Sequence, residues 1–439
     1  MISRDQTEIR MSYKYSDKAS MSSGYVYLVV ALLCIPVFYS ALLPRIVSIL
    51  LLMSSCILSF NMFLKKGSIL QFDLKSWGAL VFWLFAGIYI LLCSVLSISA
   101  DSFSSMALAL VIFISLLTVR GVSWIEPAVY SIAALLVVFP LVTVVTYIFP
   151  ELYTTIFKPL FLAAQPMAVD YRAGLTSHYS VNGSLCAFAF IFYSCLSLFG
   201  PSNKHKVLFR ILAVASFVAL LLTTKRSQLI CALLAIVICY LGSGVKNKGF
   251  KIFFTTIATL LVMSVVVPMV PGFEASINRL FGTFSSGASV EDSLSGRTIL
   301  WDYAIEGWLA SPIFGNGWGS YYFVWPDGIT VSNMAHNELL NLLFEVGLFG
   351  SICVLLFLIY TLSLTLKMIR KTDDSSGLSL LMLSLALQIF LIVYGFSSGS
   401  IFGLLNHATM YFFAVSIIYA FQARKSCRSI KYSGVNDGQ

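Results

Sequence analysis

The chain has 439 residues, of which 59% are apolar and only 11% are charged, and its mean hydropathy is +0.90. Soluble globular proteins carry about twice that share of charged residues, so the composition excludes a soluble domain of this length. The net charge of +9 comes from Lys and Arg spread along the chain, which argues against a nucleic-acid-binding surface. We therefore expect an all-α membrane protein that crosses the bilayer many times.

Twelve apolar segments are long enough to cross a membrane. Each has about 17 to 25 residues, which as an α-helix spans the roughly 30 Å hydrocarbon core of a bilayer. In chain order they lie near residues 25–43, 45–64, 76–98, 102–119, 127–149, 180–199, 207–224, 227–243, 250–271, 341–366, 377–397 and 401–422. A polar start followed by a long apolar run predicts that the first helix is an anchor and not a cleaved signal peptide.

The distribution of Lys and Arg supports this number of spans. If the N-terminus is cytoplasmic, 21 of the 28 Lys and Arg residues fall in cytoplasmic segments, as the positive-inside rule requires. An omitted span would invert every later loop and destroy this bias. The basic residues left on the outer side are Arg45, Lys158, Arg172, Lys225, Arg226, Arg279 and Arg297. Both termini are thus predicted to be cytoplasmic.

The predicted spans divide the chain into five parts. They are an N-terminal tail (1–24), a nine-helix membrane region (25–271), a large outer loop (272–340), a three-helix membrane region (341–422) and a C-terminal tail (423–439). The nine Cys lie almost all inside apolar spans and lack metal-ligand spacing, which is typical of small core residues. Neither a metal site nor a disulfide framework is therefore expected.

The outer loop 272–340 concentrates four of the seven Trp residues. Residues 297–309 within it are predicted to form a helix at the membrane surface. One face of this helix would carry Arg297, Trp301, Ile305 and Trp308, and the other Asp302 and Glu306. The alternative for the Trp residues, taken singly, is an aromatic belt with no role in ligand binding.

Two further signals follow the predicted helix. Ser311-Pro312 ends it, and Gly315-Asn316-Gly317-Trp318-Gly319 predicts a loop whose backbone can approach another surface closely.

A polar stripe begins where the outer loop meets the tenth span. At about 100° per residue, one side of that helix carries Asn337, Glu338, Asn341 and Glu345, and such a stripe cannot face lipid. With Asn333 as the N-cap, His336 would lie in the first turn, where the helix dipole keeps an imidazole neutral and able to accept a proton. A lone His is more often structural, but the stripe and the nearby arginines favour a functional role here.

Several of these segments occur together in the order and spacing of a known family. They are Thr223-Thr224-Lys225-Arg226-Ser227 at a helix turn, Ser295-Gly296-Arg297 with Trp301 and Pro312, the glycine-rich loop 315–319, and Ala335-His336-Asn337-Glu338 with Glu345-Val346-Gly347. Together they resemble the bacterial O-antigen ligase and Wzy-type polymerase superfamily over roughly residues 170 to 350. Arg172-Ala173-Gly174-Leu175 is similar to a weaker element of the family. The chain departs from the family at Lys225, where relatives often have a small residue.

The resemblance implies a GT-C-like fold and a glycosyltransferase active on the periplasmic face of the bacterial inner membrane. Its donor would be an undecaprenyl-diphosphate-linked glycan, and neither a metal, a nucleotide sugar nor another cofactor would take part. The acceptor would be a second lipid-linked glycan for a polymerase, with a chain-length regulator as a candidate partner, or a lipid A core sugar for a ligase. The segments around Arg297 and His336 resemble polymerases slightly more, so O-antigen polymerase is the first hypothesis and O-antigen ligase the alternative.

The residue types fit this chemistry. Because the outer loops hold no Asp-x-Asp motif for a divalent cation, arginines must stabilise the diphosphate leaving group. Arg226 and Arg297 are the first candidates, with Arg172 and Lys225 as further ones. His336 would take the proton from the acceptor hydroxyl, with Glu338 as the rival base, and direct displacement predicts inversion. The residues assigned to the lining of the substrate site are Trp301, Tyr321, Asn337 and Asn341.

A lipid-linked glycan flippase is the alternative from another class, because it would also have about twelve spans and buried cations. Against it, no repeat relates the two halves of the chain, and the predicted chemistry gathers in one outer loop.

Overall fold

The computed structural model describes residues 23–65, 86–87, 89, 111, 122–161, 171–176, 178–200, 205–243, 297–328, 331–372, 375–397 and 400–433. Almost all regular structure in these ranges is helical, which confirms the predicted all-α class. The predicted span 250–271 and the loop segment 272–296 lie outside the described residues. The predicted spans 76–98 and 102–119 lie almost wholly outside them, so the number of twelve spans stays a prediction.

The other predicted spans each overlap a helix. These helices are α2 (Ser23–Phe38), α3 (Arg45–Lys65), α6 (Val122–Leu136), α7 (Val138–Ile148), α9 (Tyr179–Leu198), α10 (Lys206–Leu222), α11 (Arg226–Gly242), α16 (Glu338–Ile369), α17 (Ser375–Ser397) and α18 (Leu405–Ser433). Within the described ranges, four helical segments are long and apolar enough to cross a membrane: Trp124–Ile148, Tyr179–Leu198, Glu338–Ile369 and Ser375–Ser397.

The predicted span 127–149 is divided between α6 and α7, which meet at Val137. Pro140 explains the division, because proline lacks the N–H that would bond the Leu136 carbonyl one turn earlier. Beyond α7 the chain forms short helical turns: α8 (Pro150–Leu152), η2 (Tyr153–Phe157), η3 (Lys158–Leu160) and, further along, η4 (Tyr171–Ala173).

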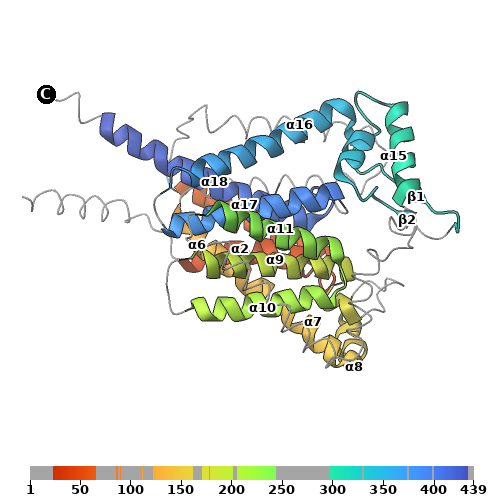
Figure 1. Ribbon diagram of the computed structural model, residues 1–439, viewed down its shortest axis with the longest axis horizontal. Coiled ribbons are helices and arrows are strands. Elements are labelled where there is room, and N and C mark those ends of the chain that lie inside the picture. The colour runs from red at the N-terminus through yellow and green to blue at the C-terminus, as the bar shows by residue number, and fades with distance from the viewer. Residues whose placement is uncertain are drawn as a thin grey trace, which may run out of the picture.

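The long helices lie side by side in a bundle with α9 at its centre (Figure 1). Helix α9 contacts α6, α10, α11 and α17, and its side chains are almost all buried. In contrast, α3 exposes a row of large apolar side chains, and Ile46 is 73% exposed. Apolar surface of this extent is unfavourable in water and suits contact with lipid.

One end of the bundle carries the part of the outer loop that the structure describes. Helix α15 (Arg297–Ala310) runs crosswise to the long helices at this end, and a hairpin of two short strands lies beside it (Figure 1). Strands β1 (Phe323–Val324) and β2 (Val331–Ser332) pair antiparallel, with Phe323 opposite Ser332. The C-terminal end of α18 lies at the other end of the bundle (Figure 1).

Candidate functional site

Helix α15 forms where the sequence predicts it and packs on the beginning of α16. Its buried face is centred on Leu300 and Ala304, and Gly307 leaves no room for a Cβ against the Phe344 ring. Ile305, on the face predicted to carry Arg297, Trp301 and Trp308, is exposed, because it lies about 100° away from Ala304 around the helix. The face that packs on α16 is therefore centred to one side of the predicted face.

The buried face of α15 meets an aromatic cluster. Tyr303, Tyr321 and Phe344 have ring centroids 5.1 to 5.5 Å apart. Tyr321 is only 1% exposed and donates its hydroxyl to the Leu300 carbonyl at 2.8 Å. Burial, and secondarily the nearby Tyr303, raises the pKa of the Tyr321 phenol. Tyr321 therefore stabilises the loop from within.

The glycine-rich loop docks on the backbone of α16, as its sequence predicts. The N–H of Gly317 donates to the Glu345 carbonyl at 2.8 Å, and the N–H of Leu348 donates to the Pro312 carbonyl at 2.9 Å. These bonds are possible because α16 breaks at Gly347, which has φ +63° and ψ −169°. A Cβ at Gly315, where φ is +72°, would lie 2.5 Å from backbone atoms of Glu345.

We expect Gly315→Ala to destabilise the protein by about 2 to 4 kcal/mol, because it adds both strain at positive φ and overlap with the α16 backbone. The free energy of unfolding can be measured by SDS titration in mixed micelles. Gly328→Ala is a control for strain alone, since φ there is +67° but no heavy atom lies within 4 Å of the added Cβ. Equal losses for Gly315→Ala and Gly328→Ala would show that the docking contact contributes nothing.

Helix α16 begins four residues beyond the position expected from Asn333. Its N-cap is Asn337, whose Oδ1 accepts from the N–H groups of Leu339 and Leu340 at 3.0 and 3.3 Å. The predicted N-cap at Asn333 is therefore wrong, and His336 precedes the helix instead of lying in its first turn. His336 is half-buried and adopts φ +55°, a left-handed conformation that is uncommon for a residue with a side chain.

One side chain of the predicted polar stripe and one side chain of α15 hold this segment in place. The Asn341 Oδ1 accepts from the Ala335 N–H at 2.7 Å, directly before His336. The Trp301 Nε1 of α15 donates to the Ala335 carbonyl at 3.0 Å. Because Trp301 lies one turn after Arg297, this bond links the helix that carries Arg297 to the segment that carries His336.

The acidic residues of the stripe face the protein interior, as predicted. Glu338 is 1% exposed, and its Oε2 accepts from the Ile401 N–H at 2.8 Å, with further bonds from the Ser400 hydroxyl and the Phe402 N–H. The Glu345 carboxylate is likewise buried and accepts from backbone N–H groups of the glycine-rich loop and of Tyr321. Each carboxylate thus fixes a loop to the start of α16.

A cluster of cations lies at the turn between α10 and α11. Arg172, from η4, donates from Nη1 to the Thr224 hydroxyl at 2.9 Å. Its Cζ lies 5.1 Å from the centre of the Tyr179 ring, and the Lys225 Nζ lies 4.0 Å from the same ring centre. Arg226 follows directly as the first, half-buried residue of α11. The structure thus brings the predicted Arg172 next to the predicted Lys225-Arg226 pair.

Arg297 lies near Tyr394 of α17, which bonds the first turn of α11. Burial lowers the pKa of the Arg297 guanidinium, and the nearby Tyr394 hydroxyl of α17 opposes this change. The Tyr394 hydroxyl also accepts from the Gln228 Nε2 in the first turn of α11 at 3.1 Å. Tyr394 and Gln228 therefore connect Arg297 to the turn that carries Arg226.

Neither Tyr394 nor Gln228 was predicted from the sequence. Gln228 is fully buried, and its Nε2 also bonds the Ser180 carbonyl and the Ser184 hydroxyl of α9, both at 2.8 Å. A glutamine inside an apolar span was the available signal, because a buried amide needs hydrogen-bond partners. Nothing in the sequence indicates that Tyr394, far along the chain, is one of them.

A buried histidine, His407, is linked to Gln228 through Ser184. The buried His407 of α18 contacts the Ser400 carbonyl through Nδ1 at 2.6 Å and the Ser184 hydroxyl through Nε2 at 2.8 Å. A chain of buried polar contacts therefore runs from Glu338 through Ser400 and His407 to Ser184, which also bonds Gln228. It ties the start of α16 to the helices beneath the cations.

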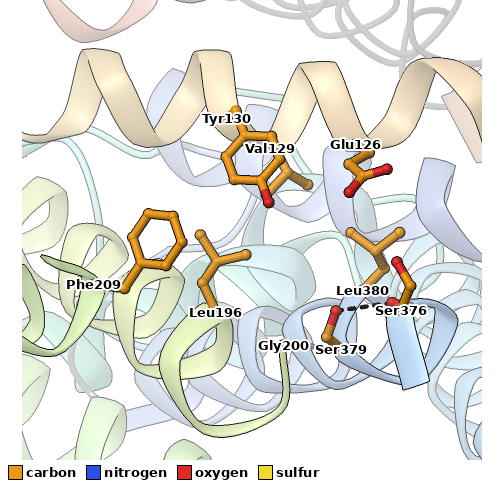
Figure 2. Close-up of a pocket in the computed structure, with 9 residues that line it drawn as sticks. All are labelled: Glu126, Val129, Tyr130, Leu196, Gly200, Phe209, Ser376, Ser379 and Leu380. Carbon is orange, nitrogen blue, oxygen red and sulfur yellow. Dashed lines mark hydrogen bonds between the residues drawn. The ribbon is translucent and has the colours of Figure 1, made fainter. Parts of the chain in front are cut away.

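A small cavity lies away from the cations, at the other ends of α9 and α10, and Figure 2 shows the residues that line it. Its lining residues are Glu126, Val129, Tyr130, Leu196, Gly200, Phe209, Ser376, Ser379 and Leu380. None of them is a predicted site residue, and they come from the N-terminal half of α6, the C-terminal end of α9 and the N-terminal ends of α10 and α17. In the part of the chain that the structure describes, no group of His, Cys, Asp or Glu is arranged to hold a metal ion.

The fold and the site define a helical membrane protein with a cation-rich polar site at one end of its bundle. Residues 211–355 match the sequence model of the family described as O-antigen ligase. The match runs from α10 into α16 and includes Lys225, Arg226, Arg297 and His336, so the predicted resemblance to the O-antigen ligase and polymerase superfamily is confirmed. No curated protein matches the chain.

Proposed function

We propose that the protein transfers a glycan from undecaprenyl diphosphate to a hydroxyl group of an acceptor sugar. The observation that carries this proposal is that Arg172 and Lys225 share the Tyr179 ring beside Arg226, at the N-terminal ends of α9 and α11, while Arg297 lies near Tyr394, whose hydroxyl bonds Gln228 in the first turn of α11. Cations gathered in a partly buried site are stabilised by an anionic ligand, and a lipid diphosphate supplies several negative charges at the membrane surface. The family match supports a glycosyl-transferring enzyme.

The arginines would stabilise the leaving group. As the bond between the anomeric carbon and the phosphate oxygen breaks, negative charge grows on the diphosphate, and guanidinium groups can bind its oxygens in a bidentate manner. Arg226 and Arg297 are proposed to bind the two phosphates, and Arg172 and Lys225 to lie at the edge of the diphosphate. The products are the glycosylated acceptor and undecaprenyl diphosphate.

His336 is the proposed base. Its ring nitrogen would take the proton of the acceptor hydroxyl as that oxygen attacks the anomeric carbon, and the proton would then pass to water. Attack on the side opposite the leaving diphosphate gives inversion at this carbon. The link from Trp301 to Ala335 supports this role, because it holds the His336 segment against the helix that begins with Arg297.

The surroundings of Glu338 support His336 over Glu338 as the base. The Glu338 carboxylate is buried and accepts bonds from the Ser400 hydroxyl and from two backbone N–H groups of the same loop. A carboxylate engaged in this way is poorly placed to take a proton from a sugar. We propose that Glu338 positions the loop before α18.

The proposed location is the bacterial inner membrane, with the site on the periplasmic side. Helix α15 and the C-terminal end of α18 lie at opposite ends of the bundle (Figure 1), which agrees with a periplasmic loop and a cytoplasmic C-terminus. Most Lys and Arg residues fall in segments predicted to lie on the same side of the membrane as the C-terminus, which supports the same orientation.

We propose O-antigen polymerase as the first candidate and O-antigen ligase as the second, since both use the same donor. The purified protein in detergent would receive lipid-linked repeat units together with an equal amount of lipid A core. Longer lipid-linked glycans are expected for a polymerase. Glycan found only on lipid A core would establish a ligase instead, and glycan on neither acceptor would contradict both candidates.

A further inference from the structure

Tyr179 is an aromatic residue with an unusual set of neighbours. It is the first residue of α9, and His178 before it caps the helix by accepting from the Ser180 N–H through Nδ1 at 3.1 Å. The His178 and Tyr179 rings stack with their centroids 4.3 Å apart, which fixes the orientation of the tyrosine ring. Tyr179 is only half-buried, so it is not a core residue.

Two cations from separate segments share this ring. Arg172 comes from η4 and Lys225 from the turn between α10 and α11, and their charged groups lie 5.1 and 4.0 Å from the ring centre. Two like charges held so close repel each other, whereas the negative face of an aromatic ring attracts both. Tyr179 therefore offsets part of the repulsion between Arg172 and Lys225.

We infer that Tyr179 is a positioning residue that holds Arg172 and Lys225 together for the diphosphate of the donor. This inference rests on the proposed function. A ring suits this task better than a carboxylate, because a carboxylate would occupy the N–H donors of both cations and would repel the phosphates. A ring attracts a cation through its face without accepting hydrogen bonds from its N–H groups.

The turn between α10 and α11 also positions both Arg172 and Lys225. Thr224 has φ +57°, which is a rare conformation for a β-branched residue, and its hydroxyl accepts from the Arg172 Nη1 at 2.9 Å. Lys225 follows Thr224 directly. The same strained turn thus orients Lys225 and binds Arg172, while the Tyr179 ring sets how close the two charges lie.

The structure separates the ring of Tyr179 from its hydroxyl. Among the described residues, the Tyr179 hydroxyl makes no hydrogen bond. Tyr179→Phe keeps the ring and should bind the donor as the native protein does, whereas Tyr179→Leu keeps the bulk and loses the ring face. If Tyr179 only stabilised the fold, Tyr179→Leu would weaken binding of a charged and of a neutral ligand to the same extent.

The experiment measures binding of undecaprenyl diphosphate to purified protein in detergent, with neutral undecaprenol as the matched probe. For Tyr179→Leu we expect the Kd for undecaprenyl diphosphate to rise roughly 5- to 30-fold, as expected for two lost cation–π contacts, while the Kd for undecaprenol stays unchanged. Tyr179→Met should behave in the same way and replaces Tyr179→Leu if that variant does not fold. Tyr240→Leu, at the far end of α11, should bind both probes normally.

A double-mutant cycle gives the second readout. If the ring acts through Lys225, the losses of Tyr179→Leu and Lys225→Ala should not add in the combined variant. Native binding by Tyr179→Leu, or equal weakening by Tyr179→Phe, would overturn the inference. If Arg172→Ala and Lys225→Ala themselves bind undecaprenyl diphosphate normally, the proposed diphosphate site fails, whereas their loss of binding beside a native Tyr179→Leu refutes only the role of Tyr179.

Discussion

Replacing His336 with Ala should lower the rate of glycan transfer by a factor of about 10² to 10⁴, the usual effect of losing a positioned base. Binding of undecaprenyl diphosphate should stay nearly unchanged, because the proposed phosphate ligands are Arg226 and Arg297. The transfer rate at saturating donor and the Kd for undecaprenyl diphosphate measure the two effects separately. Turnover of the native protein should also fall on acidification, since an imidazolium has no lone pair for the acceptor proton.

His336→Gln is the matched variant, because its amide can form hydrogen bonds but cannot accept the proton. It should transfer glycan as poorly as His336→Ala. If donor binding instead weakens in step with the rate, and the loss at acidic pH persists in His336→Gln, then His336 orients a phosphate oxygen. That outcome would move the role of base to Glu338.

Replacing Arg226 or Arg297 with Lys should lower kcat/KM on the order of tenfold or more, although the charge is retained. The planar guanidinium can bind two phosphate oxygens at once, whereas an ammonium group acts as a single point of charge. For Arg297 the loss should be pronounced, because its guanidinium is partly buried and lies close to the Tyr394 hydroxyl. Both variants should reach the membrane in normal amount, as measured by immunoblotting of membrane fractions.

Arg210→Lys is the control, since Arg210 is exposed near the start of α10, away from the site. Its transfer activity should equal that of the native protein. A fully active Arg297→Lys, together with an Arg297→Ala that fails only because the protein is lost from the membrane, would make Arg297 a structural anchor of α15.

The elements predicted most directly are those that depend on local sequence. Apolar length predicts most of the described helices, and the polar stripe predicts which face of α16 turns inward. The glycine-rich loop was also predictable, since close approach of two backbones requires residues without a Cβ, as Gly315 and Gly347 show.

The errors arise where contacts between distant segments decide the local structure. Asn333 and Asn337 are both suitable N-cap residues, and the choice depends on the conformation of His336 and on the bond that the Ala335 N–H donates to the Asn341 Oδ1. Likewise, the position of Glu338 in a stripe does not reveal its partner, Ile401, which is 63 residues away in the sequence.

The same limit applies to the site. The sequence predicts which cations lie on the outer side, because membrane insertion disfavours them there. It does not show that Arg172 and Lys225 meet over the ring of Tyr179, or that Arg297 approaches α11 through Tyr394. These contacts depend on how the helices pack, and no short-range pattern encodes them.

The central claim is that the cation-rich end of the bundle transfers a glycan from undecaprenyl diphosphate. The most direct test incubates the purified protein in detergent with undecaprenyl-diphosphate-linked repeat units and measures both glycan length and released undecaprenyl diphosphate. We expect longer glycans with an inverted new linkage, and release of one undecaprenyl diphosphate for each transfer. Absence of transfer in detergent, while the same preparation moves lipid-linked glycan across a vesicle membrane, would contradict the claim and indicate a transporter.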